Sequence, residues 1–158
     1  MSTSPAPAAP RVDDLLPVIT ESPDETQALG TALADRLPPG SVVALYGELG
    51  TGKTHLVKGI AEGLGLAPAA VRSPTFTILH TYDEGRRPLH HFDAYRVQTP
   101  DEFVELGFET YVNDETGLTC IEWADRVEAL LPPDTLRLSL THEAPNRRRI
   151  ALQGPDST

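Results

Sequence analysis

Residues 47–54 hold the feature that most constrains the fold, a glycine-rich loop with the spacing Gly-x4-Gly-Lys-Thr. The apolar run Val42–Tyr46 comes directly before the loop and resembles a strand that is buried on both faces of a parallel sheet. After Thr54, apolar residues recur at helical spacing as far as Gly65, which predicts a helix. A strand, a glycine loop and a helix in this order form the setting of a phosphate-binding loop. The sequence therefore predicts an α/β fold of the P-loop NTPase kind.

An earlier helix has clear signals at both of its ends. Ser22 is a suitable N-cap, Pro23 suits the first helical position, and Glu25 completes a capping box. The segment Pro38-Pro39-Gly40 ends the helix. Its expected inward face consists of five apolar residues: Ala28, Leu29, Ala32, Leu33 and Leu37.

The other strands are expected to extend this core into a sheet. They span residues 17–20, 76–82, 88–92, 118–121, 136–141 and 148–152, with a short helix opening at Thr99 and another helix at about 124–131. Asp83-Glu-Gly85 is expected to turn a hairpin between the strands at 76–82 and 88–92, and the last strand is expected at the sheet edge. We therefore expect a mostly parallel sheet flanked by helices, with antiparallel strands at the edge.

Length and composition indicate one domain. A chain of 158 residues can bury roughly two thirds of its unfolded surface in a single core. The first ten residues are almost entirely Ser, Thr, Ala and Pro, a composition typical of disorder. We expect residues 1–16 to form a disordered Ala/Pro-rich tail, 17–153 a single P-loop ATPase domain, and 154–158 a flexible C-terminus.

Charge and cysteine content limit the compartment and the partners. Cys120 is the one cysteine, which fits a reducing compartment, and no stretch approaches the ~20 apolar residues of a membrane span. We therefore expect a cytoplasmic protein with no membrane contact. A net charge of −10 argues against binding nucleic acid unaided, because phosphate contacts need a clustered positive surface.

Each fixed position of the loop has a task in binding a nucleotide. The glycines let successive N–H groups point at one anion, beside the positive end of a helix dipole. Lys53 is expected to neutralise the β- and γ-phosphates, and the Thr54 hydroxyl to ligate Mg²⁺. The expected nucleotide contacts are Gly47, Glu48, Leu49, Gly50, Thr51, Gly52, Lys53, Thr54 and His55. The chain contains no Asn-Lys-x-Asp element for guanine, so ATP is the expected nucleotide.

Two carboxylates follow apolar strands at the ends where a P-loop protein needs them. Glu122 comes directly after Leu118–Ile121, and Asp93 ends the strand 89–92. One must assist Thr54 in holding Mg²⁺ and one must orient water, and the residues alone leave the two assignments open. Both are therefore candidates for catalysis and for the metal.

Beyond the loop, the sequence is similar to the bacterial TsaE (YjeE) family. The resemblance runs in order from about Ser22 to Arg126, and the terminal hairpin fits more loosely. It rests on five segments: Gly47-Glu-Leu-Gly-Thr-Gly-Lys-Thr54, Ser73-Pro-Thr-Phe76, His91-Phe-Asp-Ala-Tyr-Arg96, Glu105-Leu-Gly107 and Ile121-Glu-Trp123. The first segment is shared by a whole superfamily, whereas the other four in this order are much more specific.

The resemblance implies an ATPase subunit of the machinery that makes threonylcarbamoyladenosine in tRNA, beside the anticodon. It implies weak activity alone, docking on a TsaD–TsaB complex, and contact with tRNA only through that complex. It also implies that Thr75 senses the γ-phosphate, that Asp93 and Glu122 are essential, and that Trp123 lies near the nucleotide.

Two other functions stay open on the residues alone. A small-molecule kinase would need an acceptor site and an arginine-bearing lid, for which Arg86 and Arg87 are the nearest candidates. A nucleotide-gated adaptor would switch its docking on ATP binding alone, with hydrolysis incidental.

Several other residues have plainer explanations. His90 and His91 are adjacent on a strand and should face opposite sides of the sheet, which argues against a shared zinc; His91 is expected to support Asp93. Cys120 is expected to be a small buried hydrophobe. The run Arg147-Arg-Arg149 is interpreted as a solvated edge strand, with contact to an acidic partner or tRNA as the alternative.

Overall fold

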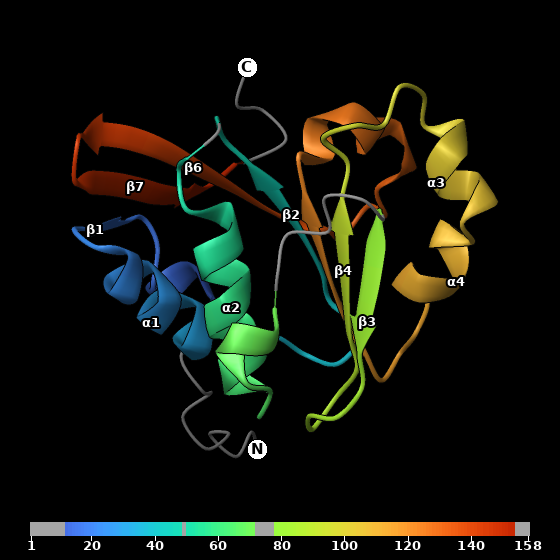
Figure 1. The fold of residues 1–158 in the computed structure, drawn as a ribbon, viewed down its shortest axis with the longest axis horizontal. Helices are drawn as coiled ribbons and strands as arrows, with labels where there is room; N and C mark the ends of the chain where they lie inside the picture. Colours follow the sequence, from blue (N-terminus) through green and yellow to red (C-terminus); the bar gives the residue numbers. More distant parts are fainter. Residues whose placement is uncertain (1–11, 49, 72–77, 154–158) are drawn as a thin grey trace, which may run out of the picture.

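Four parallel strands form the centre of the sheet (Figure 1). The structure is a computed structural model that describes residues 12–48, 50–71 and 78–153. The central strands, in spatial order, are β6 (Leu136–Ala144), β2 (Val42–Tyr46), β5 (Leu118–Glu122) and β4 (Leu89–Asp93). Because parallel strands point the same way, the carboxyl ends of β2, β5 and β4 meet at one edge. This confirms the predicted α/β class.

Antiparallel strands extend the sheet on both sides. β3 (Leu79–Tyr82) pairs with β4, while β7 (Arg147–Leu152) pairs with β6 and β1 (Val18–Thr20) pairs with β7. The prediction that the last strand lies at the edge is wrong, because β7 lies between β6 and β1. The side-chain alternation of a strand shows which face is buried, but it does not show how many neighbours the strand has.

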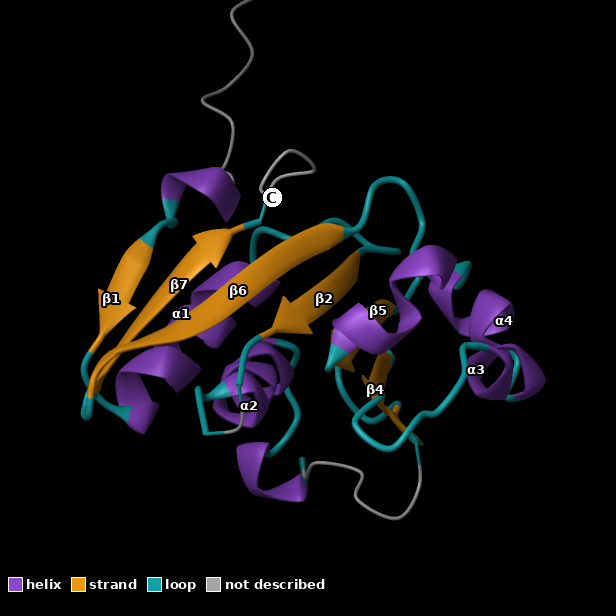
Figure 2. Cartoon of the chain, turned by 90° about the horizontal axis from the view of Figure 1, so that it is seen from above, coloured by secondary structure: helices purple, strands orange, loops and turns teal. Residues whose placement is uncertain are grey.

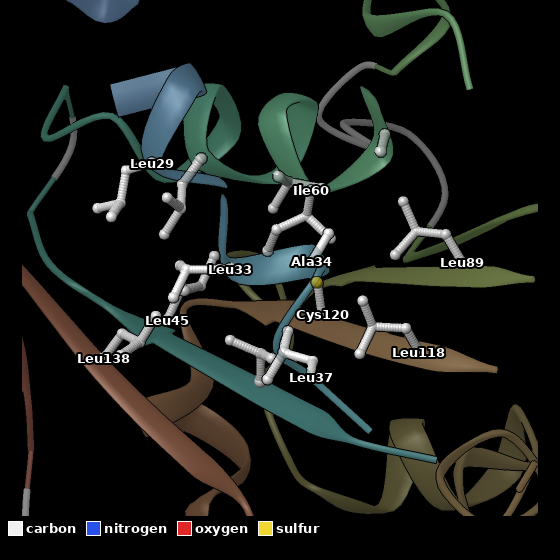
Figure 3. Close-up of a cluster of buried hydrophobic side chains, with 14 of the residues drawn as sticks. Leu29, Leu33, Ala34, Leu37, Leu45, Ile60, Leu89, Leu118, Cys120 and Leu138 are labelled. Atoms are coloured by element: carbon white, nitrogen blue, oxygen red, sulfur yellow. The ribbon is translucent and has the colours of Figure 1, made fainter. Parts of the chain in front are cut away.

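One face of the sheet is covered by α1 (Pro23–Ala34) and α2 (Lys53–Gly63) over an aliphatic core (Figure 3). Figure 2 shows the two helices together on this side. Leu33, Leu45 and Ile60 are fully buried there.

The start of α1 follows its prediction, but its buried face is rotated. Ser22 accepts a hydrogen bond from the Glu25 N–H at 3.1 Å, as an N-cap does. Ala28 is exposed, whereas Gly30 is buried and lies so close to α2 that an added Cβ would be 2.3 Å from the Leu56 carbonyl. The close approach of the two backbones therefore requires the absence of a side chain at this position.

The other face is covered by α3 (Asp101–Glu105), α4 (Phe108–Val112) and η3 (Ala124–Leu130). Its core is aromatic, with the rings of Phe92, Phe103 and Phe108 between 5.0 and 5.3 Å apart. The helix expected at 124–131 is a 3₁₀ helix that kinks at Val127.

The packed chain begins before the predicted residue 17. η1 (Val12–Asp14) precedes Leu16, which is 9% exposed and belongs to the aliphatic core. A second short 3₁₀ helix, η2 (Pro68–Ala70), follows α2. The predicted disorder of residues 1–11 and 154–158 falls outside the described residues. Within 12–48, 50–71 and 78–153, no helix is long and apolar enough to cross a membrane.

Candidate functional site

The glycine loop joins the end of β2 to the start of α2, as predicted. Gly52 is the N-cap of α2 with φ 99°, and Gly50 has φ 82°. Both lie in the left-handed region that favours glycine. Among the described residues other than its chain neighbours, none comes within 4 Å of where a Cβ of Gly50 would stand, so this part of the loop faces open space.

Lys53 is held within the loop by backbone carbonyls. Its Nζ donates hydrogen bonds to the oxygens of Gly47 at 2.6 Å and Glu48 at 2.8 Å, and lies 4.0 Å from the centre of the Trp123 ring. Burial lowers the pKa of Lys53, and the nearby charge of Glu122 opposes that effect. The ammonium group is therefore partly stripped of water and close to the start of α2.

Glu122 is a buried carboxylate at the end of β5. It is 2% exposed, and both of its oxygens accept from Thr54 Oγ1, at 3.0 and 3.1 Å. His91 Nε2 lies 2.6 Å from Glu122 Oε2. The prediction that His91 supports Asp93 is replaced by this contact. The side chain of His91 therefore stabilises the other predicted carboxylate.

Asp93 lies beside Glu122 at the end of the neighbouring strand. The two residues are paired in the register of β4 and β5. Asp93 is half-buried, and its Oδ1 accepts from the Tyr95 N–H at 2.8 Å. Both acids were predicted at strand ends, and parallel pairing brings these two carboxylates together although they are far apart in the sequence.

Trp123 has a left-handed backbone, with φ 58° and ψ 42°. This conformation is uncommon for a bulky residue and costs energy that the surroundings must offset. The indole ring lies over Lys53 Nζ and 4.8 Å from the Tyr95 ring. The unusual turn therefore sets an aromatic side chain beside the loop lysine.

A cavity of about 540 Å³ opens above these groups, within the size range of small-molecule sites. The predicted site residues that line it are Gly50, Thr51, Gly52, Lys53, Thr54, His55, Asp93, Glu122 and Trp123. Gly47 and Glu48 contribute carbonyls to Lys53 but do not line it. Leu49 and Thr75 lie outside the described residues.

The opposite wall of the cavity was missed by sequence reasoning. It includes Glu21, Ser22, Pro23 and Thr26 at the start of α1, with Asn146 and Arg148 from the β6–β7 hairpin. Arg148 Nη2 donates to the Gly50 carbonyl at 3.3 Å, so the basic run is more than a solvated strand. Tyr95 and Arg96 also line the cavity. The signals were a basic run and the aromatic-basic pair after Asp93, but no local pattern shows that they face one space.

The donor set suits Mg²⁺. Thr54 and the two carboxylates offer oxygen ligands, which Mg²⁺ prefers, and Mg²⁺ sites in P-loop proteins rely on one or two carboxylates plus substrate phosphates. Among the described residues, no group of three or more His, Cys, Asp or Glu side chains is placed to hold a metal. A site in which phosphate oxygens complete the ligand set fits these residues.

The remaining predictions have clear outcomes in the described ranges. His90 and His91 do face opposite sides of the sheet, contacting Asp114 and Glu122 respectively. Cys120 is fully buried, and burial raises the pKa of its thiol. Arg86 and Arg87 bond to carbonyls at the ends of α1 and α2 and do not line the cavity.

Comparisons with known proteins identify chains that are similar to this one. A family model described as "Threonylcarbamoyl adenosine biosynthesis protein TsaE" matches residues 20–150. The tRNA threonylcarbamoyladenosine biosynthesis protein TsaE of Bacillus subtilis is 40% identical over 133 residues, 84% of this chain and 82% of the relative. Its counterpart in Treponema pallidum is 40% identical over 134 residues, 85% of this chain and 97% of the relative. The crystal structure of Bacillus subtilis YdiB is similar with a TM-score of 0.69 and 34% identity, covering 87% of this chain and 83% of that one.

Proposed function

The chain belongs to the TsaE family, and from this premise we propose that it serves tRNA threonylcarbamoyladenosine biosynthesis as a Mg²⁺-dependent ATP hydrolase. One observation carries the proposal: the loop threonine Thr54 bonds to the buried carboxylate of Glu122, directly beneath an open glycine loop. A P-loop hydroxyl joined to a strand-end carboxylate is the arrangement that a phosphate-bound Mg²⁺ requires.

ATP binds with its phosphates against the loop and the N-terminus of α2. The N–H groups of the first turn of α2 and the helix dipole favour an anion there. Lys53 exchanges its bonds to the Gly47 and Glu48 carbonyls for bonds to phosphate oxygens. Its partly desolvated ammonium interacts more strongly with phosphate than an exposed lysine does.

Thr54, Glu122 and Asp93 would hold the metal, directly or through water. When bound, Mg²⁺ supplies positive charge that offsets the negative charge on the phosphates. The Thr54 hydroxyl donates to both carboxylate oxygens of Glu122, and this contact keeps the hydroxyl oriented.

Asp93 is proposed to orient the attacking water. It is half-buried and lines the cavity, whereas Glu122 is 2% exposed and already accepts bonds from Thr54. The water oxygen bonds to the γ-phosphorus as the bond to the β–γ bridging oxygen breaks, and ADP retains the electron pair. The released phosphate carries the protons of the water and loses one of them to solvent. Lys53 stabilises the charge on the transferring group.

Partners complete the proposed function. The family resemblance implies that the chain docks on TsaD and TsaB, hydrolyses ATP weakly alone, and meets tRNA only within that complex. Its single cysteine fits the cytoplasm as the compartment. The net charge of −10 supports indirect contact with tRNA, because the chain lacks the positive balance of an independent RNA binder.

The test is ATP hydrolysis by the purified protein, alone and with TsaD–TsaB, with Lys53→Ala as the blank. Stimulation by the partners is expected, together with a loss of at least about 100-fold in the Lys53→Ala variant. Nucleotide binding with no hydrolysis in either condition would contradict the proposal.

A further inference from the structure

We propose that His91 is a positioning residue for ATP hydrolysis, because its imidazole holds the Glu122 carboxylate against Thr54 from the interior of the sheet. This inference rests on the proposed function and names a further residue of the same site. It concerns a side chain that does not line the cavity and therefore acts only through Glu122.

The register of β4 and β5 places the imidazole behind the carboxylate. His91 is paired with Cys120, and Asp93 with Glu122. His91 therefore lies two positions before the strand end at which the two acids stand. Side chains two positions apart on a strand share a face, so His91 and Asp93 point to the same side as Glu122. His91 Nε2 reaches Glu122 Oε2 at 2.6 Å from a fully buried position.

The second ring nitrogen shows that this contact has a cost. With Nε2 donating to Glu122, Nδ1 is an acceptor, and it has no hydrogen-bond partner among the described residues. A buried polar atom without a partner destabilises a protein, and an aliphatic side chain would fill this place without that loss. Packing alone therefore does not explain a histidine here, whereas the bond to Glu122 does.

The neighbouring histidine provides a matched control. His90 makes the same type of bond, from Nε2 to Asp114 Oδ2 at 2.9 Å, but on the opposite face. Its Nδ1 is also paired, with Thr81 Oγ1 at 3.1 Å. Neither His90 nor Asp114 lines the cavity. The two residues therefore share a strand and a type of contact and differ in what their carboxylates touch.

Removing the imidazole should loosen the Glu122–Thr54 unit. Among the described residues, Glu122 would keep only the hydrogen bonds from Thr54, and its side chain could rotate away from them. Losing a group that orients a metal-site carboxylate typically costs about 10–100-fold in metal affinity or activity. We expect a fall of this size in kcat with TsaD–TsaB, a higher Mg²⁺ concentration at half-maximal rate, and a KM for ATP within about threefold of wild type.

The test compares His91→Leu, His91→Gln and His91→Asn with His90→Leu. The glutamine amide can reproduce the Nε2 donor, whereas the asparagine amide is one methylene too short to reach Glu122. The measurements are kcat, KM, the Mg²⁺ dependence, and Mg²⁺-dependent ADP binding followed by thermal shift. We expect His91→Gln to keep most of the wild-type kcat and Mg²⁺ dependence, and His91→Leu and His91→Asn to lose them. His90→Leu should change only the stability of the protein.

Two results would overturn the inference. One is a His91→Leu variant with kcat and Mg²⁺ dependence within twofold of wild type. The other is an equal loss of kcat in His91→Gln and His91→Asn. This second comparison still tests the role of His91 if the leucine variant does not fold. If wild type hydrolyses no ATP, the proposed function fails, while the Mg²⁺-dependent ADP binding of the Gln and Asn variants still tests His91.

Discussion

Each face of the sheet carries a contact between a histidine and a carboxylate, and the two contacts lie in different surroundings. On the α1–α2 face, His91 contacts Glu122, which is buried and hydrogen-bonded to Thr54 at the end of the glycine loop. On the aromatic face, His90 contacts Asp114, whose side chain is 28% exposed and also accepts from the Thr116 hydroxyl. The second pair ties the segment after α4 to β4. The two pairs therefore differ in that Glu122 lines the cavity and Asp114 does not.

The largest difference is expected from replacing each carboxylate by its amide. Glu122→Gln should lower ATP hydrolysis with TsaD–TsaB by about 10²–10³-fold, because charge beside Thr54 and the phosphates is lost. Asp114→Asn should leave hydrolysis per folded molecule within about twofold, because the hydrogen bonds of Asp114 go to His90 and Thr116, which do not line the cavity. Steady-state kinetics on both variants measure the two rates of ATP hydrolysis. If both rates fall equally, the proposed difference between the two histidine–carboxylate pairs is wrong.

Truncation in the aromatic core should affect stability and spare the chemistry. Phe103 is fully buried, with its ring 5.0 Å from Phe92 and 5.3 Å from Phe108. Phe103→Ala should lower the free energy of unfolding by about 3–5 kcal/mol, and Leu33→Ala on the other face by about 2–5 kcal/mol. Urea unfolding measures both. A kcat per folded molecule that falls tenfold in Phe103→Ala would show that the aromatic face also shapes the site.

A smaller effect is expected on stability in acid. The hydrogen bond from His90, with further bonds from Thr116, lowers the pKa of Asp114 from 3.8 to about 2. A carboxyl whose pKa is lower in the folded state stabilises the protein above its unfolded pKa and loses that effect as the pH falls through the folded value. After allowing for solvent screening, the contribution is about 1–2 kcal/mol, lost between about pH 4 and pH 2.

Thermal unfolding of wild type and Asp114→Asn across this range provides the measurement. The stability difference between the two proteins should be largest above pH 5 and shrink towards pH 2. A difference that stays constant with pH would show that the ionised carboxyl of Asp114 is not what stabilises this face.

The sequence predicted the parts of the site that depend on one segment or on strand direction. The loop from Gly47 to Thr54 is a local structure, and its glycine positions are dictated by backbone conformation. Asp93 and Glu122 were each predicted at the end of an apolar strand, and the parallel register of β4 and β5 places the two residues side by side.

Features that depend on distant segments could not be predicted in this way. Arg148 reaches Gly50 across 98 positions, and the start of α1 completes the cavity wall. The contact of Gly30 with Leu56 depends on how two helices cross. The partner of His91 depends on side-chain direction within the sheet. Each of these contacts depends on how helices and strands pack against one another. Local propensity and periodicity do not contain that information.

The measurement that tests the central claim most directly is threonylcarbamoyladenosine formation over repeated cycles by TsaD–TsaB with wild type or Glu122→Gln. ATP binding by the variant is checked first. Wild type should support many products per complex, whereas Glu122→Gln, which binds ATP but hydrolyses it slowly, should support about one round. Repeated cycles with a variant that binds ATP and does not hydrolyse it would contradict the claim and favour an adaptor switched by nucleotide binding alone.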